Sequence, residues 1–267
     1  MKLRLAYRGD PARSRGGQGG AEGFGLSLLE QLDELRRRLV YAAAAIGVGM
    51  VIAFAYITPI YEFVFRPIRR VLPPGSKLIY TEPGEAFSVY VEIALIAGIV
   101  LATPFLMYQL WNMVAPLLYL RQKKFVVWFV LLTTGGFVAG AAFNHYVAFR
   151  WMVIFFASFS SAKLTFLPRL DDVFGLYTKM LLGMGLVFQM PALVYFLAKM
   201  GLVTARFLAK QFKYAILIIF VVAAVVTPTG DATTQLVFAL PMVGLYLLSI
   251  FIAWVVTPAE RPAEEGQ

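Results

Sequence analysis

The sequence predicts an all-α polytopic membrane protein with six transmembrane helices. Of its 267 residues, 60% are hydrophobic and only 15% are charged, and the mean hydropathy of +0.74 exceeds what a single soluble core requires. Backbone polar groups cannot stay unpaired in lipid, and no segment alternates with the period of barrel strands, so each span is expected to be a helix. The apolar stretches lie at about residues 39–58, 88–118, 125–148, 173–198, 213–227 and 234–256.

The fifth stretch and the segments between spans depart from a simple helical hairpin pattern. Residues 213–227 fall short of the roughly 20 residues that cross about 30 Å of hydrocarbon, so the bilayer is expected to be distorted near the last two helices. Residues 59–87 and 149–172 are long, mixed and aromatic. They are expected to form amphipathic pieces at the outer interface that cap a concave bundle.

The distribution of Lys and Arg predicts the orientation. Sixteen of the 24 lie in the two termini and the two loops on their side, seven lie on the other face, and Lys179 lies inside a span. The positive-inside rule therefore places both termini in the cytoplasm. Membrane topology and contact with anionic lipid then explain the excess of Lys and Arg. Nucleic acid becomes a poor explanation for the net charge of +9.

The two ends of the chain are predicted to be tails. Residues 1–25 are rich in Gly and Arg without an apolar run of signal-peptide length, so they are expected to be an uncleaved, disordered cytoplasmic tail. Residues 26–256 are expected to form the transmembrane domain and residues 257–267 a cytoplasmic C-terminal tail. No internal repeat is found, which argues against an inverted-repeat transporter.

The composition argues against an enzyme. With no cysteine and only one histidine, His145, the chain has no thiolate chemistry, no disulfide and no multi-His metal site. Neither HExxH nor GxSxG occurs, and the apolar spans contain no Asp. No metal and no cofactor are expected.

Polar residues inside the spans are the better candidates for function. Gln189 lies near the middle of the stretch 173–198, beside Pro191. It can make an interhelical hydrogen bond, or it can border a groove where the proline kinks the helix. Lys179, about 15 Å nearer the outer end, is expected to snorkel to the interface.

A second polar patch lies in the stretch TPFLMYQLWNMVAPLLYLRQKKF. Pro104 and Pro116 bracket Gln109, Trp111 and Asn112. An interfacial aromatic belt explains the tryptophan and the following cations, but not two prolines around a polar trio. These residues favour a bent helix end that forms the wall of a cytoplasm-facing recess.

A dense charge block, LLEQLDELRRRLV, precedes the first span. On a helix Glu30 and Glu34 share one face, and Asp33 faces Arg36 and Arg37. The simplest interpretation is a solvated helix start with a positive-inside anchor. Two carboxylates at i and i+4 repel each other, however, so a guanidinium ligand could satisfy both.

Several motifs together resemble the TatC family, the polytopic core of the twin-arginine protein translocase. They are LDELRRRL, RPI, ATPFLMYQLWNMVAPLLY, GLVFQMP and VVTPTGDATTQLVFALPM, in unbroken order over about residues 26–256. The resemblance implies a cupped six-helix bundle that recognises the Arg-Arg signal peptides of folded cargo. It also implies recruitment of single-span TatA- and TatB-type partners, a homo-oligomer within a larger complex, and transport driven by the proton-motive force.

The resemblance also assigns roles to individual residues. The signal-peptide site is expected at Glu34, Glu30, Arg36, Gln122, Trp111, Met113 and Gln109. Structural or partner-contact roles are expected for Pro67, Pro104, Gln189, Pro191 and Asp231.

Three of these positions depart from the family pattern. Gln122 and Gln189 stand where the family usually has glutamate, and Met113 replaces a usual aromatic residue. A neutral acceptor binds a guanidinium about half as strongly as a charged one, so Glu34, helped by Glu30, is expected to bear most of the recognition. Two alternatives stay open: a diverged paralogue that does not bind signal peptides, and a small-solute transporter that uses Gln189 and Lys179.

Overall fold

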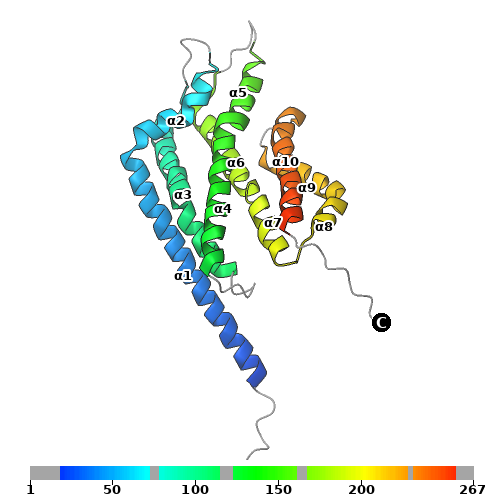
Figure 1. The fold of residues 1–267 in the computed structure, drawn as a ribbon. Helices are drawn as coiled ribbons and strands as arrows, with labels where there is room; N and C mark the ends of the chain where they lie inside the picture. Colours follow the sequence, from blue (N-terminus) through cyan, green and yellow to red (C-terminus); the bar gives the residue numbers. More distant parts are fainter. Residues whose placement is uncertain (1–18, 73–77, 115–122, 161–166, 228–230, 257–267) are drawn as a thin grey trace, which may run out of the picture. The chain divides into compact units, whose positions relative to one another are not determined.

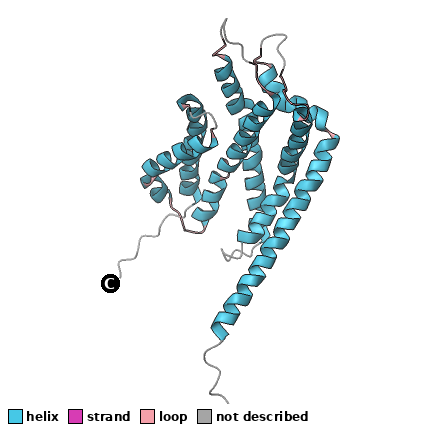
Figure 2. Cartoon of the chain, turned by 180° about the vertical axis from the view of Figure 1, so that it is seen from behind, coloured by secondary structure: helices cyan, strands magenta, loops and turns pink. Residues whose placement is uncertain are grey.

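The computed structural model describes residues 19–72, 78–114, 123–160, 167–227 and 231–256 (Figure 1). These residues are almost entirely helical, with short connections (Figure 2). The helices are α1 (Gly19–Ala55), α2 (Ile57–Arg69), α3 (Glu85–Val114), α4 (Lys123–Phe143), η1 (Asn144–Ala148), α5 (Phe149–Ala157), α6 (Leu170–Val187), α7 (Met190–Lys199), α8 (Ala205–Lys210), α9 (Phe212–Val226) and α10 (Ala232–Val256). The chain divides into two compact units, residues 1–44 and 45–267.

Five helical segments of the described chain are long and apolar enough to cross a membrane. They are Asp33–Ala55, Glu85–Met113, Val126–Ala157, Leu170–Lys199 and Ala232–Val256. Each overlaps one predicted span, which confirms an all-α polytopic architecture. The stretch predicted at 213–227 forms α9, whose 15 residues extend ~22 Å and fall short of a full crossing.

The predicted span at 173–198 is broken near its middle. α6 ends at Val187, α7 begins at Met190, and Pro191 lies in the first turn of α7. Proline has no N–H, so Pro191 cannot donate to the carbonyl of Val187 four residues earlier. The series of backbone hydrogen bonds along α6 therefore ends there. The kink predicted at Pro191 is therefore confirmed as a break between two helices.

The third predicted span is longer than expected. The sequence predicts its end near residue 148 and a separate outer piece over 149–172, but helical backbone continues through η1 into α5 as far as Ala157. No proline or glycine falls between residues 143 and 157 to stop it. The π-helical turn accommodates an extra residue and leaves Asn144 and His145 both buried.

Close helix crossings at glycines shape the unit of residues 45–267. A Cβ atom built on Gly140 of α4 would lie 2.6 Å from the carbonyl oxygen of Met184 in α6. A Cβ atom on Gly98 of α3 would lie 2.6 Å from the backbone nitrogen of Met50 in α1. Large side chains fill the core around these crossings, among them Phe65, Ile93, Phe149, Met152, Phe174, Met180 and Phe238.

A short β bridge ties together the connections before α3 and α6. The N–H of Ile79 donates to the carbonyl of Pro168 at 3.2 Å, and the N–H of Leu170 donates to the carbonyl of Ile79 at 2.8 Å. Helix α2, which precedes this connection, is amphipathic: Val64, Phe65, Pro67 and Ile68 are buried while its arginines are exposed.

Candidate functional site

The predicted recognition carboxylate, Glu34, lies on the part of α1 that belongs to residues 1–44. Its side chain is 60% exposed and forms an ion pair with Arg38, one turn along the helix. Arg37 donates from Nε to the hydroxyl of Tyr41 at 3.1 Å, and its guanidinium lies 5.6 Å from the Tyr41 ring centre. The charge block is therefore locally organised by i,i+4 contacts, and the Glu34 carboxylate stays open to solvent.

The neighbours of Glu34 in the predicted site are described only in part. Arg36 is exposed on α1. Glu30 lies one turn before Glu34 on the α1 backbone, and its side chain lies outside the described ones. Gln122 lies outside the described residues.

The end of α3, in the other unit, carries the remaining predicted signal-peptide residues. Trp111 is only 2% exposed and packs against Phe129 of α4 and Phe196 of α7, with ring centres 4.8 and 5.8 Å away. Gln109 is half-buried and Met113 is exposed. Among the described side chains of the predicted set, Trp111 is a buried anchor, whereas Glu34, Arg36 and Met113 are exposed and can contact a ligand.

Gln189 makes the interhelical hydrogen bond that was one of its two predicted roles. Its side-chain nitrogen donates to the carbonyl of Thr133 in α4 at 3.1 Å and to the carbonyl of Gly185 in α6 at 3.2 Å. The amide is 7% exposed, and its oxygen has no hydrogen-bond partner among the described residues. Gln189 therefore fastens the break between α6 and α7 to α4.

The other predicted structural residues lie at helix ends or within helices. Asp231 caps α10, because its carboxylate accepts from the N–H of Thr234 at 2.7 Å. Gln235 donates to the carbonyl of Phe220 at 2.9 Å and so joins α10 to α9. Pro67 lies buried inside α2, and Pro104 lies exposed inside α3.

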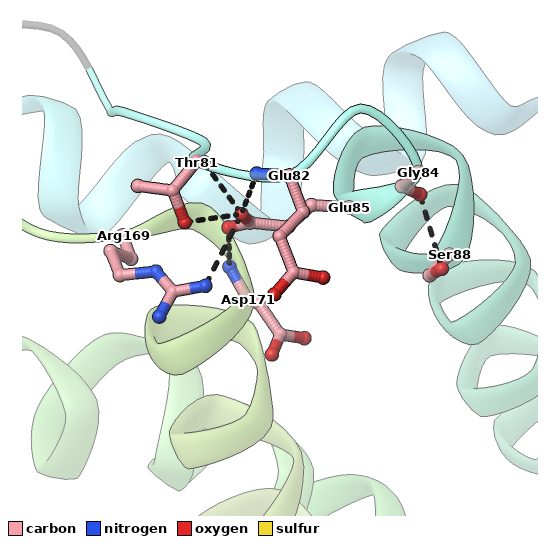
Figure 3. Close-up of polar contacts among 7 residues, drawn as sticks. All are labelled: Thr81, Glu82, Gly84, Glu85, Ser88, Arg169 and Asp171. Atoms are coloured by element: carbon pink, nitrogen blue, oxygen red, sulfur yellow. Dashed lines mark hydrogen bonds and ion pairs between the residues drawn. The ribbon is translucent and has the colours of Figure 1, made fainter.

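A buried carboxylate that the sequence analysis did not single out lies at the start of α3. The side chain of Glu85 is 4% exposed. One of its oxygens accepts from the N–H of Thr81 at 2.8 Å and from Arg169 at 3.4 Å, and the other accepts from the N–H of Asp171 at 3.2 Å (Figure 3). These bonds reinforce the bridge between the connections before α3 and α6.

The electrostatics of this cluster favour a lasting ion pair. The hydrogen bond to Glu85 raises the pKa of the Arg169 guanidinium, and the negative charge of Glu85 adds to the rise. The only sequence signal for the contact was the presence of both residues in the segments predicted to lie on the same face. Their partnership depends on tertiary folding.

The single histidine is also buried in a polar contact. His145 Nδ1 lies 3.2 Å from the hydroxyl of Tyr177, and its ring stacks on Phe63 with centres 4.0 Å apart. No group of three His, Asp or Glu side chains in the described part of the chain could hold a metal ion.

Comparisons with known proteins agree with this architecture. Residues 30–241 match the family described as Sec-independent protein translocase protein (TatC). The TatC of Koribacter versatilis is 39% identical over 250 residues, which cover 91% of this chain and 92% of that protein. The TatC of Helicobacter pylori strain 26695 is 40% identical over 239 residues, covering 90% of this chain and 92% of the relative.

A solved structure is similar as well. It is described as "Crystal Structure of Twin Arginine Translocase Receptor- TatC", and it superposes with a TM-score of 0.74 and 31% sequence identity. The match covers 85% of this chain and 100% of that one. The chain therefore belongs to the TatC family: it is a TatC component of a twin-arginine translocase, a multi-pass membrane protein that acts in protein transport and is not an enzyme.

Proposed function

We propose that this TatC is the receptor and scaffold subunit that binds Arg-Arg signal peptides of folded cargo at its cytoplasmic face, with Glu34 as the main ligand. The observation that carries the proposal is the exposed Glu34 carboxylate, which forms an ion pair with the neighbouring Arg38. An ionised carboxylate offers about four lone-pair sites, so it can keep Arg38 and still accept a second guanidinium.

The chemistry of such a site favours arginine over lysine. A guanidinium can bind a carboxylate through two parallel hydrogen bonds, whereas an ammonium is a compact point charge without that planar geometry. Glu30, one turn away on the same helix, adds negative potential for the second arginine of the pair. Arg36 disfavours cationic ligands on its own face and so limits where the peptide can lie.

The end of α3 carries further residues that we propose contact the peptide. Met113 and Gln109 offer an apolar and an amide contact, and buried Trp111 holds them in place through its aromatic neighbours. Gln122 adds a neutral acceptor where the family usually has a glutamate. The resulting site can still form hydrogen bonds to a guanidinium, but it has fewer negative charges than a site with the family's usual glutamate.

The proposal includes the family's topology and partners. Six spans, with α9 crossing a locally thinned bilayer, form a cupped bundle in the bacterial inner membrane with both termini in the cytoplasm. TatA- and TatB-type single-span subunits join it in a homo-oligomeric complex, and the proton-motive force drives export. Pro67, Pro104, Gln189, Pro191 and Asp231 shape the helices that these partners contact.

Complementation tests the proposal. A bacterial strain that lacks its own TatC receives this chain together with the TatA and TatB genes of the same source, and export of a folded reporter is measured. Export that requires the Arg-Arg motif of the reporter, and that an uncoupler stops, is the expected result. Export that persists with a Lys-Lys reporter would contradict the proposal, and so would a complete absence of export from a chain that is stably inserted.

A further inference from the structure

An apolar cavity lies between α2, α3, α4, η1 and α6, and none of its lining residues belongs to the predicted recognition set. Its volume is about 460 Å³, and it is open on one side. Its walls include Phe63 of α2, Ala97 of α3, Val138 and Ala142 of α4, and Leu181 of α6. The polar side chains that reach the lining are His145, Tyr146 and Tyr177, and His145 and Tyr177 pair with each other.

The cavity is bordered by three helical segments that are long and apolar enough to cross a membrane, and its length is close to the thickness of one leaflet. Along α4 and η1 its lining runs from Val138 to Tyr146, which corresponds to ~12 Å of helix. Half of a hydrocarbon core about 30 Å thick is ~15 Å. A partner's spanning helix would need a groove through both leaflets, whereas the acyl region of a single lipid needs only one.

Exposed arginines surround the end of the cavity on the α2 side. Arg66 follows the lining residue Phe63 by three positions in α2, and Arg70 follows Arg66 by four, so the three share one side of the helix. Helix α2 packs against η1, which carries His145 of the cavity wall, and against α5. Arg150 in α5 lies one turn beyond the lining residue Tyr146.

These guanidiniums are available to an anion. No ion pair joins Arg66, Arg70 or Arg150 to another residue within the described ranges. Glu62, the carboxylate on α2, lies two positions from the lining residues Ile60 and Val64 and so faces away from the cavity. The end of the cavity is therefore positively charged while its interior is apolar.

We propose that this cavity binds an anionic phospholipid of the leaflet on the α2 side. One acyl chain fills the apolar space between Phe63, Val138 and Leu181, and the phosphate accepts charge-assisted hydrogen bonds from Arg66 and Arg150. Tyr146 lines the cavity and is 64% exposed, so it lies between the acyl chain and the phosphate group of the lipid. Such a lipid would hold α2 against the bundle.

Native mass spectrometry of the full chain in detergent micelles tests the site. Phosphatidylglycerol and phosphatidylcholine with identical acyl chains are titrated, and the fraction of protein that carries one bound lipid is measured at each concentration. Phosphatidylglycerol should bind about tenfold more tightly than phosphatidylcholine, and Arg66→Gln should reduce that preference several-fold. The matched control is Arg69→Gln, which removes an equal charge from the same helix, where the guanidinium lies over Tyr61 instead.

Two further measurements distinguish a bound lipid from a bound protein segment in the cavity. Ala142→Leu narrows the cavity and should weaken binding of both lipids, while Leu182→Ala, on an exposed position of α6 outside the lining, should not. A photo-crosslinking amino acid at Val138 in native membranes should yield a lipid adduct. A protein adduct at Val138, equal binding of the two lipids, or equal effects of Arg66→Gln and Arg69→Gln would each overturn the proposal.

Discussion

Glu85 and Arg169 are 84 positions apart in sequence, and Arg169 donates a hydrogen bond to the Glu85 carboxylate at 3.4 Å (Figure 3). The same carboxylate also accepts from the N–H groups of Thr81 and Asp171. A buried carboxylate is costly unless donors surround it, and here the donors come from two separate connections. Glu85 therefore fixes the connection before α3 to the start of α6.

We predict that Glu85→Gln destabilises the protein. A neutral amide has one acceptor oxygen in place of two, and its NH₂ group would face the N–H donors, so at least one hydrogen bond is lost. The apparent Tm in detergent should fall by about 4 °C. Glu82→Gln, a neighbouring exposed carboxylate, is the control and should leave the Tm unchanged.

The ion pair should also be insensitive to mild alkali. The pKa of Arg169 is raised by Glu85, and a group whose pKa is raised on folding loses its stabilising effect only as the pH rises through that folded-state value. Arginine in an unfolded chain is also fully protonated at neutral and mildly alkaline pH. The Tm difference between wild type and Arg169→Gln should therefore be equal at about pH 7 and about pH 9, and a difference that halves over this interval would contradict the assignment.

Two glycines of α4 form a matched pair for the close crossing with α6. A Cβ atom on Gly140 would meet Met184 O at 2.6 Å, whereas a Cβ atom on Gly135 would meet nothing within 4 Å. Gly140→Ala should therefore cost about 1–3 kcal/mol of unfolding free energy through overpacking. Gly135→Ala should be neutral or stabilising by up to about 1 kcal/mol. Similar denaturant midpoints for the two variants would show that α4 and α6 do not cross this closely.

Gln189 should tolerate an apolar replacement better than an acidic one. Gln189→Met removes hydrogen bonds whose worth inside a membrane averages about 0.6 kcal/mol. Gln189→Glu would place a carboxylate against the carbonyls of Thr133 and Gly185, which can only accept, so it should cost more. Unfolding of both variants in a common detergent checks the order; a glutamate variant as stable as wild type at neutral pH would refute it.

The spans could be predicted because their cause is local in sequence. Apolar length alone located the five full-length spans of the described residues, and Pro191 located the break between α6 and α7, because each depends on neighbouring residues. The short α9 was anticipated for the same reason. By contrast, the continuation of α4 through η1 into α5 was missed, because mixed aromatic composition indicated an interfacial piece while nothing in the backbone stopped the helix.

The candidate site was only partly predictable. Gln189 was identified because a polar residue inside a span is costly, and it does bond to another helix. The burial of Trp111 against Phe129 and Phe196 could not be foreseen, because it depends on how α3, α4 and α7 pack together. The Glu85 cluster was missed for the same reason, since its donors are distant in sequence.

The most direct test of the central claim is titration of an Arg-Arg signal peptide against the purified protein, measured by fluorescence anisotropy. Loss of a charge-assisted hydrogen bond costs about 1.5–3 kcal/mol, so Glu34→Gln should weaken binding by roughly 10- to 100-fold. The neighbouring control, Asp33→Asn, should change the Kd little, and a Lys-Lys peptide should bind weakly to every variant. A Glu34→Gln variant that binds the Arg-Arg peptide as tightly as wild type would contradict the account.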